Sequence, residues 1–223
     1  MIYVLDDDAG KTVLILKGEK YKYLIKVRRH SMGDELFFRN KEHIEQLYRY
    51  KITDIEPRSV TLELLETKEY VVKPQKNFHI GWCVIDSKSI EKVLASLNEM
   101  GVSKISFIYC DRSQKNFKPD LKRYQRILEA SNQQCGRTDF IEFETFKDLS
   151  SFIQTYPDTQ VLDFAPEILE DEASILRVLI GCEGGFSPSE KELLASQKRF
   201  RFDTPLVLRS ESAALAISAK VLL

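Results

Sequence analysis

The sequence has few of the residues that build metal and redox sites. It contains three histidines, at positions 30, 43 and 79, and four cysteines, and no two cysteines form a C-x-x-C pair. Zinc sites require closely spaced Cys and His ligands, so no plausible zinc spacing is present and a metal enzyme is disfavoured. We expect no metal and four reduced cysteines, namely Cys83, Cys110, Cys135 and Cys182.

Long hydrophobic runs and a basic leader are also lacking. No apolar run approaches the roughly 20 residues that a membrane-spanning helix needs. The first ten residues, MIYVLDDDAG, are acidic where a signal peptide would be basic. The composition is 43% hydrophobic and 30% charged, which is ordinary for a soluble globular protein. We therefore expect a cytoplasmic protein of one large or two small domains, with no membrane partner.

Net charge is small, at −1, so the whole molecule does not suggest a polyanionic partner. The charges are nevertheless segregated along the chain. Residues 17–29 and 112–126 each carry six basic residues against one acidic, with Tyr or Phe between them, whereas 139–172 holds ten acidic residues and one basic. Basic side chains neutralise phosphates and aromatic rings stack on unpaired bases. Either run alone could be a solvated helix face, but two runs in different parts of the chain favour RNA binding.

The first 72 residues have a β-rich pattern. Short runs rich in β-branched, aromatic and leucine residues (TVLILK, DELFF, HIEQLYRYKITDI and SVTLELLE) are separated by turn signals such as Gly10, Gly18 and Pro57. In SVTLELLE, apolar and polar residues alternate as in a half-buried strand. Several short strands at close spacing predict a small barrel or sandwich over residues 1–72.

From about residue 73 the pattern alternates between strands and helices. Strands are expected at 79–85, 104–110, 161–165, 175–181 and 206–208, and helices at 87–101, 119–136, 188–199 and 210–223. Such alternation predicts a mostly parallel sheet covered by helices. The chain is thus expected to be an α/β protein with a small β domain at 1–72 and a larger α/β domain at 73–223.

Glycine is sparse, yet three of the nine glycines fall within residues 181–185, in the stretch GCEGGFSPSE. A strand precedes this stretch, and Ser187, Pro188 and Glu190 predict a helix start with a capping box. Such a turn places main-chain groups at the ligand-binding edge of an open α/β sheet. G-x-G-x-x-G and the P-loop are absent, so a ligand site of another kind or a plain tight turn remains. Cys182 has no neighbouring histidine, which disfavours a nucleophile.

A second strand, turn and helix are expected in TPLVLRSESAALAISAK. The final helix is apolar on nearly every side, so it is expected to be buried in the core or between subunits.

These stretches resemble signatures of the ribosomal RNA small subunit methyltransferase E family. IGCEGGFSPSE is similar to I-G-P-E-G-G-[FW]-[ST]-x-x-E, and LVLRSESAALAISA to [RV]-L-R-x-E-T-A-x-x-x-A. LNEMGVSKISFIYCDRSQ, YQRILEASNQQCGR and, more weakly, the segment from LKGEKYKY to FFRN resemble further family segments in the same order. The sequence departs from the pattern at Cys182 for proline, Ser212 for threonine, Tyr124 for tryptophan and Ser131-Asn132 for the common Ala-Glu.

The resemblance implies a C-terminal SPOUT-class α/β trefoil-knot domain behind an N-terminal PUA-like β-barrel that binds RNA. It also implies S-adenosylmethionine as cofactor, a homodimer, and methylation of N3 of a uridine in the 16S rRNA of the small ribosomal subunit. A non-catalytic RNA-binding or ribosome-assembly factor that keeps the fold is one alternative, and a structural oligomer built on the last helix is another.

Site residues follow from the same resemblance. The cofactor would be held by main-chain groups of three loops, at Leu162, Asp163, Phe164 and Ala165, at Gly181, Cys182, Glu183, Gly184, Gly185 and Phe186, and at Leu206, Leu208, Arg209, Ser210 and Glu211. Glu183 is a candidate for orienting the cofactor or acting on the N3 proton, and Arg112 and Arg209 for offsetting charge on the uracil, with salt bridges that hold the loops as the alternative. Candidate RNA contacts are Lys22, Lys26, Arg28, Arg29, Arg112 and Arg123.

Overall fold

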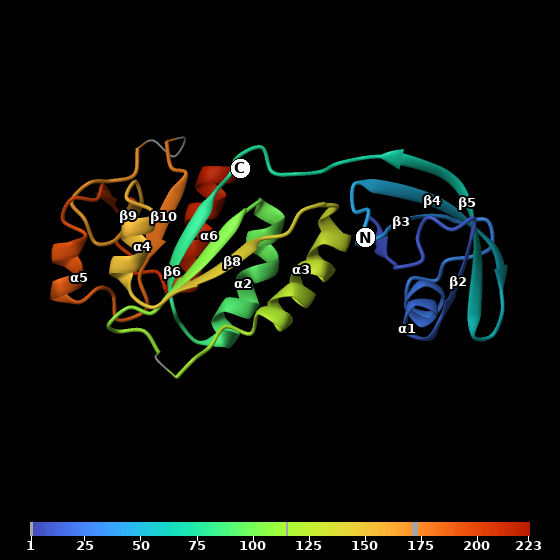
Figure 1. Ribbon diagram of the computed structural model, residues 1–223, viewed down its shortest axis with the longest axis horizontal. Helices are drawn as coiled ribbons and strands as arrows, with labels where there is room; N and C mark the ends of the chain where they lie inside the picture. The colour runs from blue at the N-terminus through green and yellow to red at the C-terminus, as the bar shows by residue number, and fades with distance from the viewer. Residues whose placement is uncertain (1, 115, 171–173) are drawn as a thin grey trace. The chain divides into compact units, whose positions relative to one another are not determined.

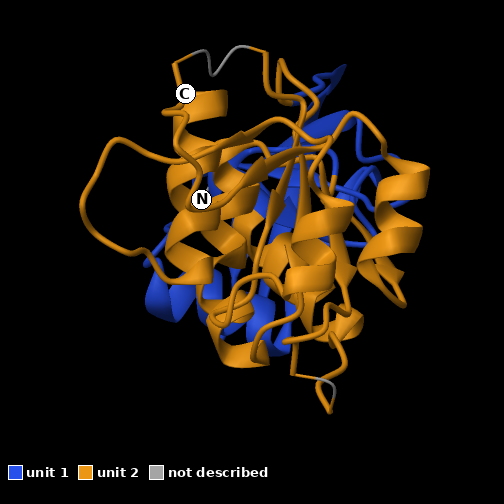
Figure 2. Cartoon of the chain, turned by 90° about the vertical axis from the view of Figure 1, so that its left-hand side faces the viewer, with its two compact units in different colours: residues 1–73, 132–139 blue, residues 74–131, 140–223 orange. Residues whose placement is uncertain are grey.

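The computed structural model describes residues 2–114, 116–170 and 174–223, so Lys115, Asp171 and Glu172 of the charged segments lie outside the described residues. Two compact units make up the chain (Figures 1 and 2): residues 1–73 with 132–139, and residues 74–131 with 140–223. No sequence pattern indicates that residues 132–139 group with the N-terminal unit, because most of them fall within the helical pattern of 119–136. No helix in the described ranges is long and apolar enough to cross a bilayer.

The N-terminal unit is built on a five-stranded sheet of order β1-β3-β4-β5-β2. Its elements are β1 (Val4–Leu5), β2 (Val13–Lys17), α1 (Gly18–Tyr21), a π-helical turn η1 (Lys22–Val27), β3 (Glu35–Arg39), β4 (Gln46–Ile55) and β5 (Ser59–Glu69). The expected alternation is present in β5, where Val60 and Leu62 are buried and Glu63 is exposed. The buried side of the sheet forms the core of this unit together with Tyr21 and Leu24.

The second unit is an α/β layer structure around a six-stranded parallel sheet of order β11-β9-β10-β6-β7-β8. Its elements are β6 (His79–Cys83), α2 (Ser87–Met100), β7 (Lys104–Ile108), α3 (Leu121–Cys135), β8 (Glu142–Phe146), α4 (Leu149–Thr155), β9 (Gln160–Leu162), β10 (Arg177–Ile180), α5 (Pro188–Leu193), β11 (Arg199–Phe200) and α6 (Ser210–Leu222). The last four residues of α3, Asn132 to Cys135, belong to the other unit. The α/β class and the parallel sheet are as predicted.

Local signals set the helix ends. The Asp86 carboxylate accepts from Ser89 N at 3.0 Å and caps the start of α2, and Gly101 ends that helix at φ +103°. Ile90, Leu94 and Leu97 are fully buried on one face of α2. These residues match the expected helical spacing.

Two element predictions were wrong. The helix expected over 188–199 ends at Leu193, and Arg199–Phe200 instead form a strand that pairs with β9. The segment Leu206–Leu208, expected as a strand, has no regular structure and is exposed to solvent.

The expectation of four reduced cysteines was also wrong. Cys83, at the end of β6, forms a disulfide with Cys110, and the two Cα atoms are 5.7 Å apart. The register of the sheet causes this pairing, since Cys83 stands opposite Ile108 on β7 and Cys110 follows two residues later. Cys135 and Cys182 are free thiols.

Candidate active site

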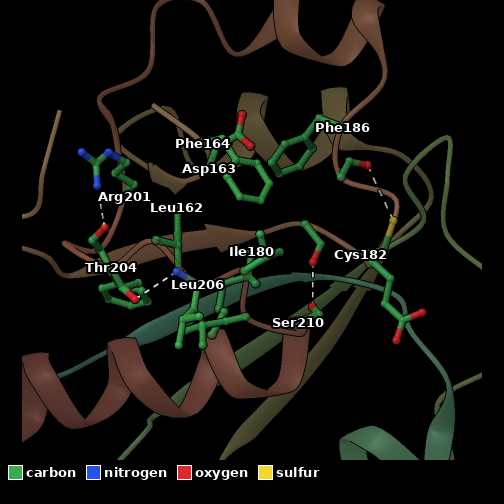
Figure 3. A pocket seen from close by; sticks show the side chains of 17 residues that line it. Leu162, Asp163, Phe164, Ile180, Cys182, Phe186, Arg201, Thr204, Leu206 and Ser210 are labelled. Atoms are coloured by element: carbon green, nitrogen blue, oxygen red, sulfur yellow. Dashed lines mark hydrogen bonds between the residues drawn. The ribbon is translucent and has the colours of Figure 1, made fainter. Parts of the chain in front are cut away.

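Three loops at the carboxyl ends of parallel strands surround an open cavity of about 160 Å³ (Figure 3). The end of β9 and the loop after it contribute Leu162 to Phe164, and the loop after β10 contributes Gly181 to Phe186 without Gly184. The segment between β11 and α6 contributes residues from Arg201 to Leu208. Ligands favour this edge in open α/β sheets, because helix starts and free loop main chain meet there. The start of α6, with Ser210 and Ala213, completes the wall.

Much of the cavity wall is apolar and faces solvent. The exposed fractions are 77% for Phe164, 73% for Leu206 and 74% for Val207. Large apolar side chains gathered around one cavity are typical of a surface that a ligand or partner covers. Ile180, Phe186 and Leu162 supply the deeper apolar lining.

The glycine loop has a defined turn at its centre. Gly185 N donates to Cys182 O at 2.9 Å, and Gly185 has φ +64°, a conformation that favours glycine. A Cβ on Gly184 would lie 3.3 Å from Cβ and Cδ of Arg112, so that glycine allows close packing of the Arg112 side chain. A Cβ on Gly181 would make only ordinary contacts. Local structure therefore explains why glycine is needed at two of the three positions, 184 and 185.

The far end of this loop is fixed by the predicted capping box. The Ser187 hydroxyl accepts from Glu190 N at 3.3 Å, and the Glu190 carboxylate accepts from Ser187 N at 2.8 Å. The second Glu190 oxygen accepts from Asp111 N at 2.8 Å, and the Asp111 carboxylate accepts from the Ser187 hydroxyl at 2.5 Å. The loop after β7 thus holds the start of α5.

The three catalytic candidates are all exposed and belong to loops at this edge of the sheet. Glu183 lines the cavity, and Arg209 is the N-cap residue of α6. Arg112 donates from one guanidinium nitrogen to Gly184 O at 2.6 Å, which ties it to the outer side of the glycine loop. Arg112 therefore has a structural contact whatever its chemical role.

Most of the predicted cofactor contacts line the cavity, and four do not. Ala165, Gly184, Arg209 and Glu211 lie next to lining residues in the chain but are not part of the wall. Sequence reasoning missed Ile180, Arg201, Phe202, Thr204, Val207 and Ala213. Arg201, Phe202 and Thr204 carried no signal, because they lie between a helix and a strand whose predicted bounds were wrong.

Cys182 is a poor candidate for a nucleophile. Its side chain is 9% exposed, and its Sγ lies 3.7 Å from Gly185 O. Burial raises the pKa of the Cys182 thiol, so the unreactive protonated form is favoured at neutral pH.

The predicted RNA-binding residues of the N-terminal unit lie together on one short segment. Lys22 and Lys26 lie on η1, Arg28 and Arg29 follow it, and all four are exposed. The Lys26 ammonium lies 5.8 Å from the centre of the Tyr21 ring and the Arg28 guanidinium 5.3 Å from that of Tyr23. Arg28 also borders a second cavity, of about 360 Å³, within this unit. In the other unit, Arg123 pairs with Glu91 at 2.6 Å, so part of its charge is already neutralised.

Comparison with known proteins gives consistent results. A family model described as an RNA methyltransferase domain matches residues 72–222. The chain is 37% identical to the ribosomal RNA small subunit methyltransferase E of Helicobacter pylori strain 26695, over 98% of both chains. A methyltransferase from Legionella pneumophila, solved in complex with S-adenosylmethionine, has a TM-score of 0.75 at 22% identity, with 98% of this chain and 96% of that chain covered. The small subunit methyltransferase E of Neisseria gonorrhoeae, also bound to S-adenosylmethionine, has a TM-score of 0.74 at 17% identity, with 98% and 95% covered.

Proposed function

The chain belongs to the ribosomal RNA small subunit methyltransferase E family, and from this premise we propose that it transfers a methyl group from S-adenosylmethionine to N3 of a uridine in 16S rRNA. One observation carries the proposal: the two loops that match family signatures, after β10 and before α6, surround a single cavity together with the loop after β9, at the carboxyl edge of the parallel sheet. RNA methylation as a class follows from the family, while the cofactor, the base atom and the residue roles are proposed.

The residues present fit S-adenosylmethionine. The adenine and ribose need apolar cover with few polar contacts, and Phe164, Leu206 and Val207 offer exposed apolar surface around the cavity. Asp163 and Glu183, on two different loops of the cavity, are carboxylates suited to hydroxyl and ammonium groups. When bound, the cofactor supplies a methyl group on a positively charged sulfur, which reacts with a nucleophile.

Uridine N3 carries a proton and is a poor nucleophile until that proton leaves. Glu183 is the cavity carboxylate that we propose for orienting the cofactor or accepting this proton. Loss of the proton places negative charge on the uracil oxygens, and we propose that Arg209 and Arg112 stabilise that charge. Arg112 keeps one nitrogen on Gly184 O, so only the rest of its guanidinium is left for the uracil.

We propose that RNA binds to a PUA-like barrel over residues 1–72 and that a SPOUT domain over residues 73–223 transfers the methyl group. The exposed basic segment of η1 supports the first role, because Lys26, Arg28 and Arg29 present their charge on the surface of that unit. The family further leads us to propose a trefoil knot in the second unit and a homodimer. Partial exposure of Ala213, Leu215 and Leu222 on α6 is consistent with a partner subunit covering that helix.

Two measurements test the function. Calorimetric titration of the purified chain with S-adenosylmethionine should give binding, and mass-spectrometric mapping of 16S rRNA with and without the protein should locate one methylated uridine. Absence of cofactor binding would favour the alternative of a non-catalytic RNA-binding or assembly factor.

Residue roles are tested in single-turnover assays with rRNA. Glu183→Gln and Arg209→Ala should each lower the rate by about 100-fold, the usual size of effect for a proton-transfer or charge-stabilising group. If both variants keep the wild-type rate, the assignment is wrong, even though the fold and the cofactor stand.

A further inference from the structure

The Ser210 hydroxyl lies where three segments of the methyltransferase unit meet. Ser210 is the first residue of α6 and is 5% exposed. Its Oγ is 2.8 Å from the indole nitrogen of Trp82 on β6 and 2.6 Å from the carbonyl oxygen of Gly181, which follows β10. A dashed line in Figure 3 marks the hydrogen bond that the labelled Ser210 makes to the carbonyl oxygen of Gly181.

The direction of both hydrogen bonds is fixed by chemistry. An indole nitrogen only donates and a carbonyl oxygen only accepts, while a serine hydroxyl has one hydrogen. Ser210 Oγ therefore accepts from Trp82, and its hydrogen goes to Gly181 O. The hydroxyl has no hydrogen left to donate to a ligand, which agrees with the main-chain role that the sequence resemblance implies for this loop.

The bond joins two walls of one cavity. Gly181 is the first residue of the glycine loop, and Ser210 is the first residue of α6; both line the cavity. The far end of the glycine loop is already held by Arg112 and by the capping box at Ser187. Ser210 fixes the near end, so the loop is anchored at both sides of its turn at Gly185.

We propose that Ser210 is a positioning residue for cofactor binding: its hydroxyl, oriented by the buried indole of Trp82, fixes the glycine loop against the start of α6. The choice of cofactor rests on the proposed function, whereas the anchoring of the loop does not.

The chain offers a matched control on the same helix. Ser218 is fully buried, and its hydroxyl donates to Ala214 O at 2.7 Å, within α6 itself. Ser210→Ala and Ser218→Ala each remove one buried serine hydroxyl from α6, but only the first one releases the glycine loop.

The first measurement uses the protein without cofactor. Amide hydrogen exchange over residues 181–186 should become about tenfold faster in Ser210→Ala and stay at the wild-type rate in Ser218→Ala. Equal exchange in the two variants would overturn the proposal. Thermal unfolding of both variants shows that they are folded under the conditions used.

The second measurement is titration with S-adenosylmethionine. Ser210→Ala should weaken binding about tenfold, equal to about 1.4 kcal/mol, and Ser218→Ala less than twofold. Trp82→Phe, which keeps the bond to Gly181 but frees the hydroxyl to rotate, should fall between them. The double variant Trp82→Phe/Ser210→Ala should bind like Ser210→Ala, because both changes act through one hydroxyl.

The outcomes separate the two proposals. If the wild-type chain does not bind S-adenosylmethionine but exchange is faster in Ser210→Ala, the proposed function is wrong and the positioning role of Ser210 is supported. If the wild-type chain binds S-adenosylmethionine and Ser210→Ala binds it equally well with unchanged exchange, the positioning role of Ser210 is wrong and the proposed function is supported.

Discussion

His79, the first residue of β6, is a buried histidine that is held in its neutral form. Its Nδ1 lies 2.8 Å from Arg177 Nε, which only donates, so the proton of the ring is on Nε2 and is directed to Ser106 Oγ at 2.6 Å. Ser106 in turn donates to Glu144 at 2.5 Å. Burial first, and then the charges of Arg177 and Lys104, lower the pKa of His79 to about 3.

This lowered pKa makes stability depend on pH. The unfolded chain binds a proton at His79 near pH 6.5 and the folded chain only near pH 3, so the stabilising contribution is complete above pH 6.5 and is lost as the pH falls. The loss should reach about 1.4 kcal/mol for each pH unit below 6.5. Urea unfolding at pH 7, 5.5 and 4.5 measures it against His79→Gln, whose amide can replace both hydrogen bonds without titrating. Parallel curves for the two proteins would contradict this account.

At the residue scale, short sequence separation decides what could be predicted. The capping box of Ser187 and Glu190 spans three residues, and the structure confirms it. By contrast, the His79 partners Ser106 and Arg177 lie 27 and 98 residues away. The sequence gives no register for the sheet, so it indicates neither this network nor the disulfide of Cys83 and Cys110.

At the scale of elements, the glycine loop gives a ranking of substitutions. Gly185→Ala should lower the free energy of unfolding by about 1 kcal/mol or more, since alanine is strained at positive φ. Gly181→Ala should change it by less than about 1 kcal/mol, because φ is not positive and the added Cβ meets only ordinary contacts. Chemical unfolding of both variants without cofactor tests the ranking, and equal losses would show that the turn at Gly185 is not the rigid part of the loop.

The prediction of elements failed where apolar residues serve a cavity instead of a core. Leu206, Val207 and Leu208 have the composition of a short strand, but their side chains line the cavity and the segment is irregular. A run of three apolar residues looks the same in the sequence whether it forms a buried strand or an irregular segment that lines a cavity. The helix over 188–199 was predicted too long because residues 194–204 contain no proline or glycine to mark its end.

At the scale of the molecule, the net charge of −1 hides how the basic residues are distributed. The charge pattern along the sequence indicates the basic segment of residues 17–29, and in the structure Lys22, Lys26, Arg28 and Arg29 of this segment are exposed on and just after η1. The sequence does not show which of these basic side chains already pair with an acidic neighbour. Lys22 pairs with Glu19 at 2.8 Å, whereas Lys26 and Arg28 lie over tyrosine rings.

Lys26 and Arg28 are therefore the residues with which to test RNA binding by the N-terminal unit. The variant Lys26→Ala/Arg28→Ala should weaken binding to single-stranded rRNA segments and leave the affinity for S-adenosylmethionine unchanged. Each phosphate contact contributes about 0.7 to the slope of log K against log salt for single strands, so the slope should become shallower by about 1.4. Lys51→Ala is the control, because Lys51 is exposed on β4 between Glu35 and Glu63 and should not contact phosphates. An unchanged affinity and slope for the double variant would show that RNA is bound elsewhere on the molecule.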